Sequence, residues 1–213
     1  MSVVSVVLVD DHRVVTRSLK AWLESFPDIK VVGIAASGEE LLQHLADWKP
    51  DVILQDLLMP GGIDGIETTR RVLQLAPSAR VIALTASVDE ARMMGVLRAG
   101  AVGYVRKDAE PETLLAAVRA VARGKTYIDP SIGKLILLQP AHPSDELTPR
   151  ETDVLRQLAL GRSNKEIAAA LLIGEETVKS HVGGVFAKLQ VENRAQAVVR
   201  AIRLRLVTLD ELE

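Results

Sequence analysis

Residues 3–11 read VVSVVLVDD, a β-branched apolar run that ends in the two acids Asp10 and Asp11. A run this short and this apolar is typical of a strand buried on both faces. Four more short apolar runs follow at regular intervals, each after a longer stretch with apolar residues at helical spacing. The predicted strands cover residues 3–9, 31–35, 52–55, 81–85 and 103–105.

The longer stretches predict helices that connect these strands and follow the last one. Their predicted ranges are residues 13–25, 39–48, 65–75, 89–99 and 112–122. Parallel strands need such crossovers, and the crossover helices cover both faces of the sheet. The alternation therefore predicts an α/β fold with a doubly wound, five-stranded parallel sheet over residues 1–125.

Composition excludes several classes of protein. The 213 residues include no cysteine, which excludes a disulfide scaffold, a thiolate zinc site and a cysteine nucleophile, and fits a reducing compartment. Because the first apolar run is interrupted by Ser5 and ends at Asp10, it is neither a signal peptide nor a membrane span. We expect a cytoplasmic protein without a membrane partner. Aromatic residues make up 3%, too few for single-strand stacking platforms or an aromatic-lined pocket.

The alternation stops after residue 125. Residues 126–146 contain Pro130, Pro140 and Pro143, and we interpret them as a linker in which residues 134–138 form a helical turn or more. From residue 147 onward the pattern is helical only. Predicted helices cover residues 149–160, 164–172, 175–189 and 195–206, so residues 147–213 are expected to form a second, all-α domain.

Polar residues follow the predicted strands at their carboxyl ends. They are Asp10 and Asp11 after the first strand, Asp56 after the third, Thr85 at the end of the fourth, and Arg106 and Lys107 after the fifth. Each alone has an ordinary structural explanation, such as a helix cap or a solvated lysine. Together they meet at the sheet edge where ligands bind, and three carboxylates there require a cation. Oxygen ligands favour Mg²⁺, while a lysine and a hydroxyl suit a phosphoryl group.

Four motifs carry a family resemblance. They are Val9-Asp10-Asp11-His12, Asp56-Leu57-Leu58-Met59-Pro60, Leu84-Thr85-Ala86 and Gly103-Tyr104-Val105-Arg106-Lys107-Asp108. Over about the first 125 residues the chain resembles the receiver domain of two-component response regulators, which has the CheY-like fold. One departure is the stretch 59–65, which is one residue longer than usual and contains Gly61 and Gly62.

The resemblance implies a role for each matching residue. Asp56 would be the phosphoacceptor, while Asp11, Asp56 and the Leu58 carbonyl would bind Mg²⁺ directly and Asp10 would bind it through water. Lys107 would pair with the phosphoryl oxygens and Thr85 would donate its hydroxyl to them. Tyr104 would be the switch aromatic that moves inward with Thr85, and in the resting state we expect its hydroxyl at the surface.

Start signals mark the helices of the second domain. Thr148 is a predicted N-cap, Pro149 stands at the first helical position, and Glu151 completes a capping box with Thr148. Ser163 and Gly174 can cap the next two helices. A short helix, a tight turn and a longer helix form a helix-turn-helix, whose second helix enters the DNA major groove. Residues 147–207 carry ten Lys and Arg against six acids, a modest basic excess suited to phosphate contacts.

About the last 65 residues resemble the LuxR-type helix-turn-helix. The matching stretches are Leu147 to Glu151, Gly161 to Ala168, Thr177 to His181, and Lys188-Leu189 with Arg194 and Ala197. The resemblance makes 175–189 the recognition helix. It implies that Lys179 and Ser180 face the bases or the DNA backbone, and that Thr177, His181 and Lys165 lie near phosphates. Lys188 is a further implied DNA contact.

Gly183 and Gly184 depart from the expected pattern, because two glycines inside a helix cost about 1 kcal/mol each relative to alanine. Gly183 stands where relatives often carry a base-reading side chain. Either fewer residues carry specificity, or the glycines let the helix approach the DNA backbone closely.

Both resemblances together match the NarL/FixJ class, and more weakly its subgroup typified by LiaR and VraR. We expect a transcription factor and not an enzyme, phosphorylated at Asp56 by a sensor histidine kinase, with phosphorylation controlling dimerisation and promoter binding. RNA polymerase is a further expected partner. Two rivals fit less well: a ligand-sensing regulator conflicts with the low aromatic content, and a phospho-aspartyl phosphatase needs an acid where Leu58 stands.

Overall fold

The computed structural model describes residues 3–86, 89–132, 147–204 and 206. The chain divides into two compact units, residues 1–124 and 125–213. All strand pairs given for the first unit are parallel, in the order β2-β1-β3-β4-β5. The strands are β1 (Val4–Val9), β2 (Ile29–Ala35), β3 (Val52–Asp56), β4 (Arg80–Thr85) and β5 (Gly103–Arg106).

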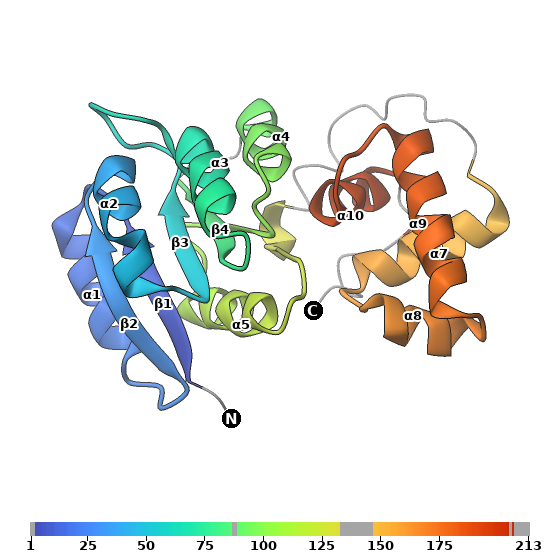
Figure 1. Ribbon diagram of the computed structural model, residues 1–213, viewed down its shortest axis with the longest axis horizontal. Coiled ribbons are helices and arrows are strands. Elements are labelled where there is room, and N and C mark those ends of the chain that lie inside the picture. Colours follow the sequence, from blue (N-terminus) through green and yellow to red (C-terminus); the bar gives the residue numbers. More distant parts are fainter. Residues whose placement is uncertain (1–2, 87–88, 133–146, 205, 207–213) are drawn as a thin grey trace. The chain divides into compact units, whose positions relative to one another are not determined.

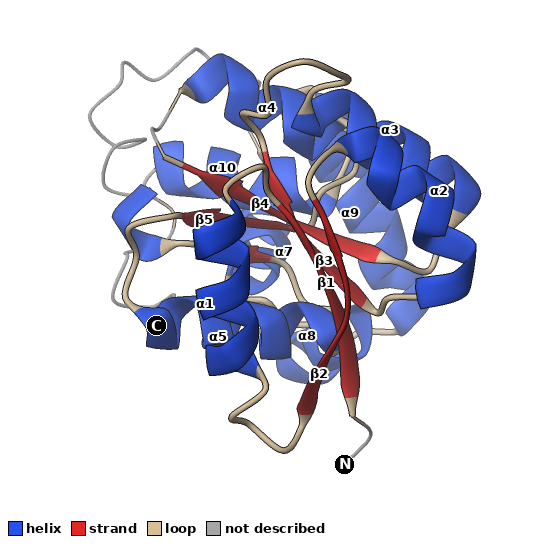
Figure 2. Cartoon of the chain, turned by 90° about the vertical axis from the view of Figure 1, so that its left-hand side faces the viewer, coloured by secondary structure: helices blue, strands red, loops and turns tan. Residues whose placement is uncertain are grey.

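Five helices cover this sheet on both faces (Figure 1). They are α1 (Arg13–Leu23), α2 (Gly38–Trp48), α3 (Gly65–Leu75), α4 (Glu90–Arg98) and α5 (Pro111–Ala122). Helices α1 and α5 lie on one face, and α2, α3 and α4 lie on the other (Figure 2). The predicted doubly wound α/β fold is confirmed, but the sheet has six strands, in the order β2-β1-β3-β4-β5-β6, and not the five predicted; the sixth is β6 (Tyr127–Ile128). The ends of the other strands and of helices α1 to α5 differ from the prediction by at most two residues.

The central strands are apolar along their length because helices cover both of their faces. Val6, Val7, Ile53 and Ile82 are fully buried. The register of the sheet pairs Val9 with Gln55, Asp56 with Leu84, and Thr85 with Arg106. The carboxyl ends of β1, β3, β4 and β5 therefore lie side by side at one edge.

The second unit consists mainly of helices (Figure 1). These are α7 (Pro149–Ala159), α8 (Asn164–Leu171), α9 (Glu175–Leu189) and α10 (Arg194–Arg203). The predicted capping box of Thr148 and Glu151 is present, and Ser163 forms a second one with Glu166. Buried Val154, Leu158, Ile167 and Val178 join α7, α8 and α9 in one core.

Two segments of this unit differ from the sequence prediction. The strand β6 (Tyr127–Ile128) lies where only a linker was expected, and with two residues it is too short to show a periodic pattern. Helix α10 covers Arg194–Arg203 and not the predicted 195–206. It begins at Arg194, because the Asn193 side chain accepts a hydrogen bond from the Gln196 N–H, and it ends three residues earlier than predicted. The helical turn expected at 134–138 lies outside the described residues. Within the described ranges, no helix combines the length and apolarity needed to span a membrane.

Candidate functional site

An acidic cluster lies at the carboxyl edge of the sheet. Asp10 follows β1, Asp56 ends β3 and Lys107 follows β5. The Lys107 Nζ lies 2.7 Å from Asp10 Oδ2 and 2.8 Å from Asp56 Oδ2. The Leu58 N–H donates a hydrogen bond of 3.1 Å to Asp56 Oδ1. The parallel topology thus brings together side chains that are far apart in the chain.

One ammonium group serves two buried carboxylates in this cluster. Burial raises the pKa of Asp56, and the hydrogen bonds from Lys107 and the Leu58 N–H offset this only in part. Burial also acts to raise the pKa of Asp10, but hydrogen bonds from Lys107 and His12 outweigh it, so that pKa is lowered. Negative charge therefore exceeds positive charge at Asp56, which favours a further cation there.

The donor set around this point fits a divalent cation. One ligand atom each from Asp10, Asp11, His12 and Asp56 lies within 4.8 Å of the others. Carboxylate oxygens are the ligands that Mg²⁺ prefers, and it keeps several waters where protein ligands are few. Asp11 keeps about a quarter of its side chain exposed, so the cluster is open to solvent on this side.

His12 is a member of the cluster for which the sequence analysis assigned no role. Its Nδ1 lies 3.0 Å from Asp10 Oδ1 and 2.9 Å from Asp11 Oδ1, while most of the ring is exposed. The hydrogen bond to Asp10 and the nearby Asp11 charge raise the pKa of His12. Its position directly after two strand-end acids is the only sequence signal that could have found it.

Thr85 ends β4 at the same edge and is buried. Tyr104, on β5, is 0% exposed, so the expectation of a surface hydroxyl is wrong for this structure. Its neighbour in register on β4 is Ala83. Burial raises the pKa of the Tyr104 hydroxyl, and a hydrogen bond with Thr85 acts in the opposite direction.

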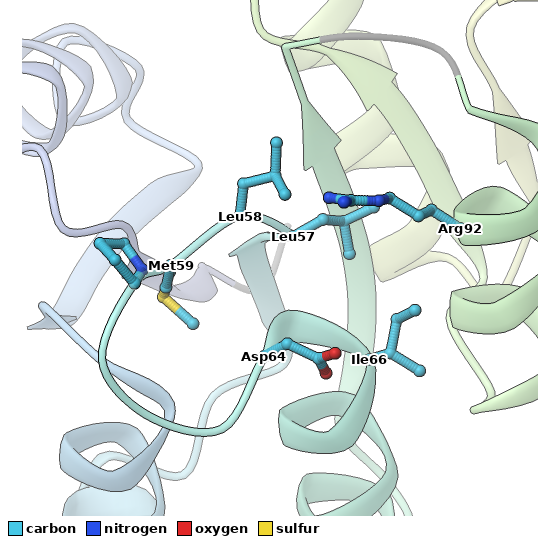
Figure 3. A pocket seen from close by; sticks show the side chains of 7 residues that line it. Leu57, Leu58, Met59, Asp64, Ile66 and Arg92 are labelled. Carbon is cyan, nitrogen blue, oxygen red and sulfur yellow. The ribbon is translucent and has the colours of Figure 1, made fainter.

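The loop after Asp56 borders a pocket of about 460 Å³. Figure 3 shows Leu57, Leu58 and Met59 from this loop, Asp64 and Ile66 at the start of α3, and Arg92 extending from α4 toward the loop. The pocket walls are mainly apolar. Gly65 opens α3 directly against β3, since a Cβ there would lie 2.3 Å from the Asp56 carbonyl oxygen.

The lengthened loop is hydrogen-bonded to α2. The Ile63 N–H donates a hydrogen bond of 2.8 Å to Glu39 Oε1, and this bond lowers the pKa of Glu39. A Cβ at Gly62 would lie 2.7 Å from the same carboxylate. Sequence reasoning missed Glu39, because no local pattern connects it with a residue 24 positions later.

Most of the predicted DNA-contacting residues lie on the surface of the helical unit. Lys179, Ser180 and Thr177 are exposed on α9, Lys165 is exposed on α8, and His181 is half-buried. The Lys179 Nζ lies 2.6 Å from Glu176 Oε1, an ion pair of two exposed side chains. The sequence analysis missed Glu176, although an acid three residues before a lysine is a recognisable helical pair.

Lys188 lies elsewhere, in an ion pair inside the helical unit. Its Nζ lies 2.8 Å from Glu151 Oε2, and Glu151 is 8% exposed. The N–H and hydroxyl of Thr148 donate to the same carboxylate oxygen. The hydrogen bond from Lys188, followed by those from Thr148, lowers the pKa of Glu151 to about 2. Lys188 thus connects α9 with the start of α7.

The two glycines of α9 have different surroundings. A Cβ at Gly184 would lie 2.8 Å from Glu151 Oε1, so this glycine makes room for the buried carboxylate. A Cβ at Gly183 would meet no atom within 4 Å among the described residues, and Gly183 is exposed. Gly184 therefore has a structural explanation within the unit, and Gly183 does not.

Comparison with known families identifies both units. The sequence model of the response regulator receiver domain matches residues 6–119, and that of the luxR family of bacterial regulatory proteins matches residues 145–201. The uncharacterized transcriptional regulatory protein YhcZ of Bacillus subtilis is 41% identical over 208 residues, which cover 94% of this chain and 96% of YhcZ. The transcriptional regulatory protein LiaR of the same organism is 37% identical over 210 residues, covering 96% and 99%.

Solved structures agree with these matches. The RcsB response regulator of Salmonella typhimurium has a TM-score of 0.61 at 30% identity, covering 93% of this chain and 97% of that one. An RcsB–DNA complex gives the same TM-score at 29% identity, covering 93% and 99%. The chain therefore belongs to the NarL/FixJ class of DNA-binding response regulators, in which a receiver domain is joined to a LuxR-type helix-turn-helix domain.

Proposed function

We propose that this chain is a transcription factor switched by phosphorylation of Asp56, with a sensor histidine kinase as the phosphodonor. In this proposal residues 1–125 are the receiver domain, residues 126–146 the linker and residues 147–213 the DNA-binding domain. The observation that carries it is the position of Lys107, whose ammonium lies within 2.8 Å of both Asp10 and Asp56. A fixed cation beside an under-neutralised carboxylate is suited to an incoming phosphoryl group.

In the transfer step an Asp56 carboxylate oxygen attacks the phosphorus of a phosphohistidine. The phosphorus–nitrogen bond breaks, the imidazole leaves and takes up a proton, and an acyl phosphate forms on Asp56. Lys107 then pairs with a phosphoryl oxygen and Thr85 donates its hydroxyl to another. When bound, Mg²⁺ would be held by Asp11, Asp56 and the Leu58 carbonyl and through water by Asp10, and it would neutralise charge on the phosphoryl oxygens.

Phosphorylation adds a charge of about −1.5 to −2 at the sheet edge. Thr85 is drawn toward this charge, and its strand β4 pairs in parallel with β5, which carries Tyr104. We infer that the surface formed by α4, β5 and α5 changes with it and controls dimerisation. A dimer places two recognition helices about 34 Å apart, one turn of DNA, and so favours repeated half-sites.

For the DNA-binding step, α9 is the recognition helix and double-stranded promoter DNA is the partner. The exposure of Lys179, Ser180 and Thr177 on α9 and of Lys165 on α8 supports this assignment. His181 is half-buried and Lys188 is bonded to Glu151, so both have fewer free donors for phosphates. RNA polymerase at the promoter is a further proposed partner.

The test is covalent labelling of the full chain with acetyl phosphate and Mg²⁺. We expect label on the wild type and none on Asp56→Asn, while Asp47→Asn, a matched change of an exposed acid on α2, keeps the label. Sedimentation velocity of the labelled protein should show a dimer that Asp56→Asn does not form. Label that persists in Asp56→Asn would place the acyl phosphate elsewhere and overturn the assignment.

A further inference from the structure

The exposed face of α9 carries functional groups in its first half only. Residues at helical spacing form one exposed stripe along this helix: Glu176, Lys179, Ser180, Gly183 and Ala187. The last two offer no hydrogen-bonding side chain. If α9 enters the major groove, as the proposed function requires, only the first turns of this stripe can contact base edges by side-chain hydrogen bonds.

Glu176 is the unusual member of this stripe. Its side chain is 85% exposed and lies on the side of α9 shared with Lys179. DNA phosphates repel a carboxylate, so an acid on a DNA-facing stripe weakens binding unless it meets a hydrogen-bond donor. The donors that a major groove presents are the amino groups of cytosine and adenine. An exposed ion pair contributes little to helix stability. An acid in the first turn of a helix is stabilising, but Glu175 already supplies one in α9, so helix stability does not require a second at Glu176.

The Glu176–Lys179 pair presents an acceptor and a donor side by side, with Oε1 and Nζ 2.6 Å apart. A G·C base pair presents the complementary set, because the cytosine amino group lies beside guanine O6, and guanine N7 follows as a second acceptor. An A·T pair presents one amino group beside thymine O4, but the next group is the thymine methyl. An A·T pair also has two acceptors, adenine N7 and thymine O4, but they lie on opposite sides of its amino group. Only G·C therefore offers the several N–H donors of Lys179 two adjacent acceptors beside an amino group.

We propose that Glu176 and Lys179 act together as a reader of one G·C base pair, with Glu176 accepting from the cytosine amino group and Lys179 donating to guanine. Glu176 is thereby a specificity-determining residue. The inference rests on the proposed DNA-binding function of α9 and adds to it the identity of a base pair. It also implies that Gly183 and Ala187 contribute no base preference through side-chain hydrogen bonds.

The experiment is selection of bound sequences from a random duplex pool by the full chain, treated with acetyl phosphate and Mg²⁺. The wild type should enrich G·C at one position of each half-site by about fivefold or more. Glu176→Ala should lose that enrichment and keep the preferences at other positions. Glu175→Ala removes the same charge from the same turn but not the 2.6 Å ion pair, and should keep the enrichment.

A double-mutant cycle tests whether the two residues act as one unit. Lys179→Ala and the double variant should lose preference at the same position as Glu176→Ala, with no additional loss in the double variant. If Glu176→Ala binds every sequence more tightly with an unchanged preference, Glu176 acts by charge alone and the inference is overturned. If no protein enriches any sequence, the DNA-binding proposal fails and the inference fails with it.

Discussion

The two units each contain a lysine bonded to a buried carboxylate far away in the chain, and the two sites differ in their balance of donors and acceptors. In the receiver unit, Lys107 is shared between Asp10 and Asp56. In the helical unit, Glu151 receives Lys188 together with the N–H and hydroxyl of Thr148. Asp56 receives the Leu58 N–H and an ammonium that it shares with Asp10, whereas Glu151 receives three donors on its Oε2.

The pKa values of Asp56 and Glu151 shift in opposite directions. Burial raises the pKa of Asp56, whereas Lys188 and Thr148 lower that of Glu151 to about 2. A carboxylate whose burial is offset only in part can take a further cation. Glu151, with three donors on one oxygen, joins α9 to the start of α7. The donors around Asp56 and Glu151 therefore account for the opposite directions of their pKa shifts.

The largest effect is expected where the shared ammonium is removed. Lys107→Met should slow labelling by acetyl phosphate at least about a hundredfold, because the phosphoryl oxygens lose a fixed charged donor. It should also destabilise the receiver unit by about 3 kcal/mol at neutral pH, since two buried acids then face each other. Labelling rates and the thermal unfolding of Trp22 and Trp48 fluorescence measure both effects.

A matched variant and a metal titration complete this experiment. Lys30→Met makes the same change at an exposed lysine of β2 and should leave both measurements unchanged. Mg²⁺ should stabilise Lys107→Met more than the wild type, because the acids of the cluster then lack their cation. Equal stability of Lys107→Met and wild type without Mg²⁺ would show that the ammonium does not hold the cluster together.

A smaller loss is expected at the Glu151 site. Lys188→Met should destabilise the helical unit by about 1 to 3 kcal/mol, because the Glu151 carboxylate keeps only its Thr148 donors. Both tryptophans, Trp22 and Trp48, lie in the receiver unit. Hydrogen exchange of the α7 and α9 amides is therefore the measurement that reports on the helical unit alone. Unchanged exchange in Lys188→Met would remove the structural role of this pair.

The Glu151 site also makes the stability of the helical unit depend on pH in the acid range. The folded pKa of Glu151 lies at about 2, below its ordinary value of 4.5. Its contribution to stability is therefore complete above about pH 4.5 and is lost as the pH falls toward 2. In Lys188→Met the folded pKa rises toward the ordinary value, so this loss becomes smaller. The slope of hydrogen-exchange stability against pH in α7 checks the difference.

The contrast also explains which parts were predictable from the sequence. Asp10, Asp56 and Lys107 follow predicted strands, and parallel topology brings strand ends to one edge, so local patterns indicated their proximity. The bond between Lys188 and Glu151 spans 37 residues and depends on how helices cross, which no local pattern records. The burial of Tyr104 likewise depends on the elements that pack around β5, which a local sequence pattern does not record. The roles assigned to the site residues stay predictions until labelling and binding are measured.

The paired glycines of α9 test whether the Glu151 site is as crowded as its contacts indicate. Alanine in place of an exposed helical glycine gains up to about 1 kcal/mol, and we expect about half that or more for Gly183→Ala. Gly184→Ala should gain nothing or destabilise, because its Cβ would lie 2.8 Å from Glu151 Oε1. Exchange rates of the α9 amides compare the two, and equal gains would contradict the crowding.

The smallest effect is expected at Leu172, between α8 and α9. Leu172 is 91% exposed and has a φ of 54°, a left-handed conformation that disfavours leucine and that asparagine tolerates. Leu172→Asn should therefore stabilise the helical unit by about 0.5 kcal/mol, measured by hydrogen exchange in α8. Leu171→Asn is the control: this leucine packs against the core of Val154, Ile167 and Val178, so the same change should destabilise. Opposite signs at adjacent leucines would show that local backbone conformation and packing, rather than side-chain polarity, decide stability at this turn.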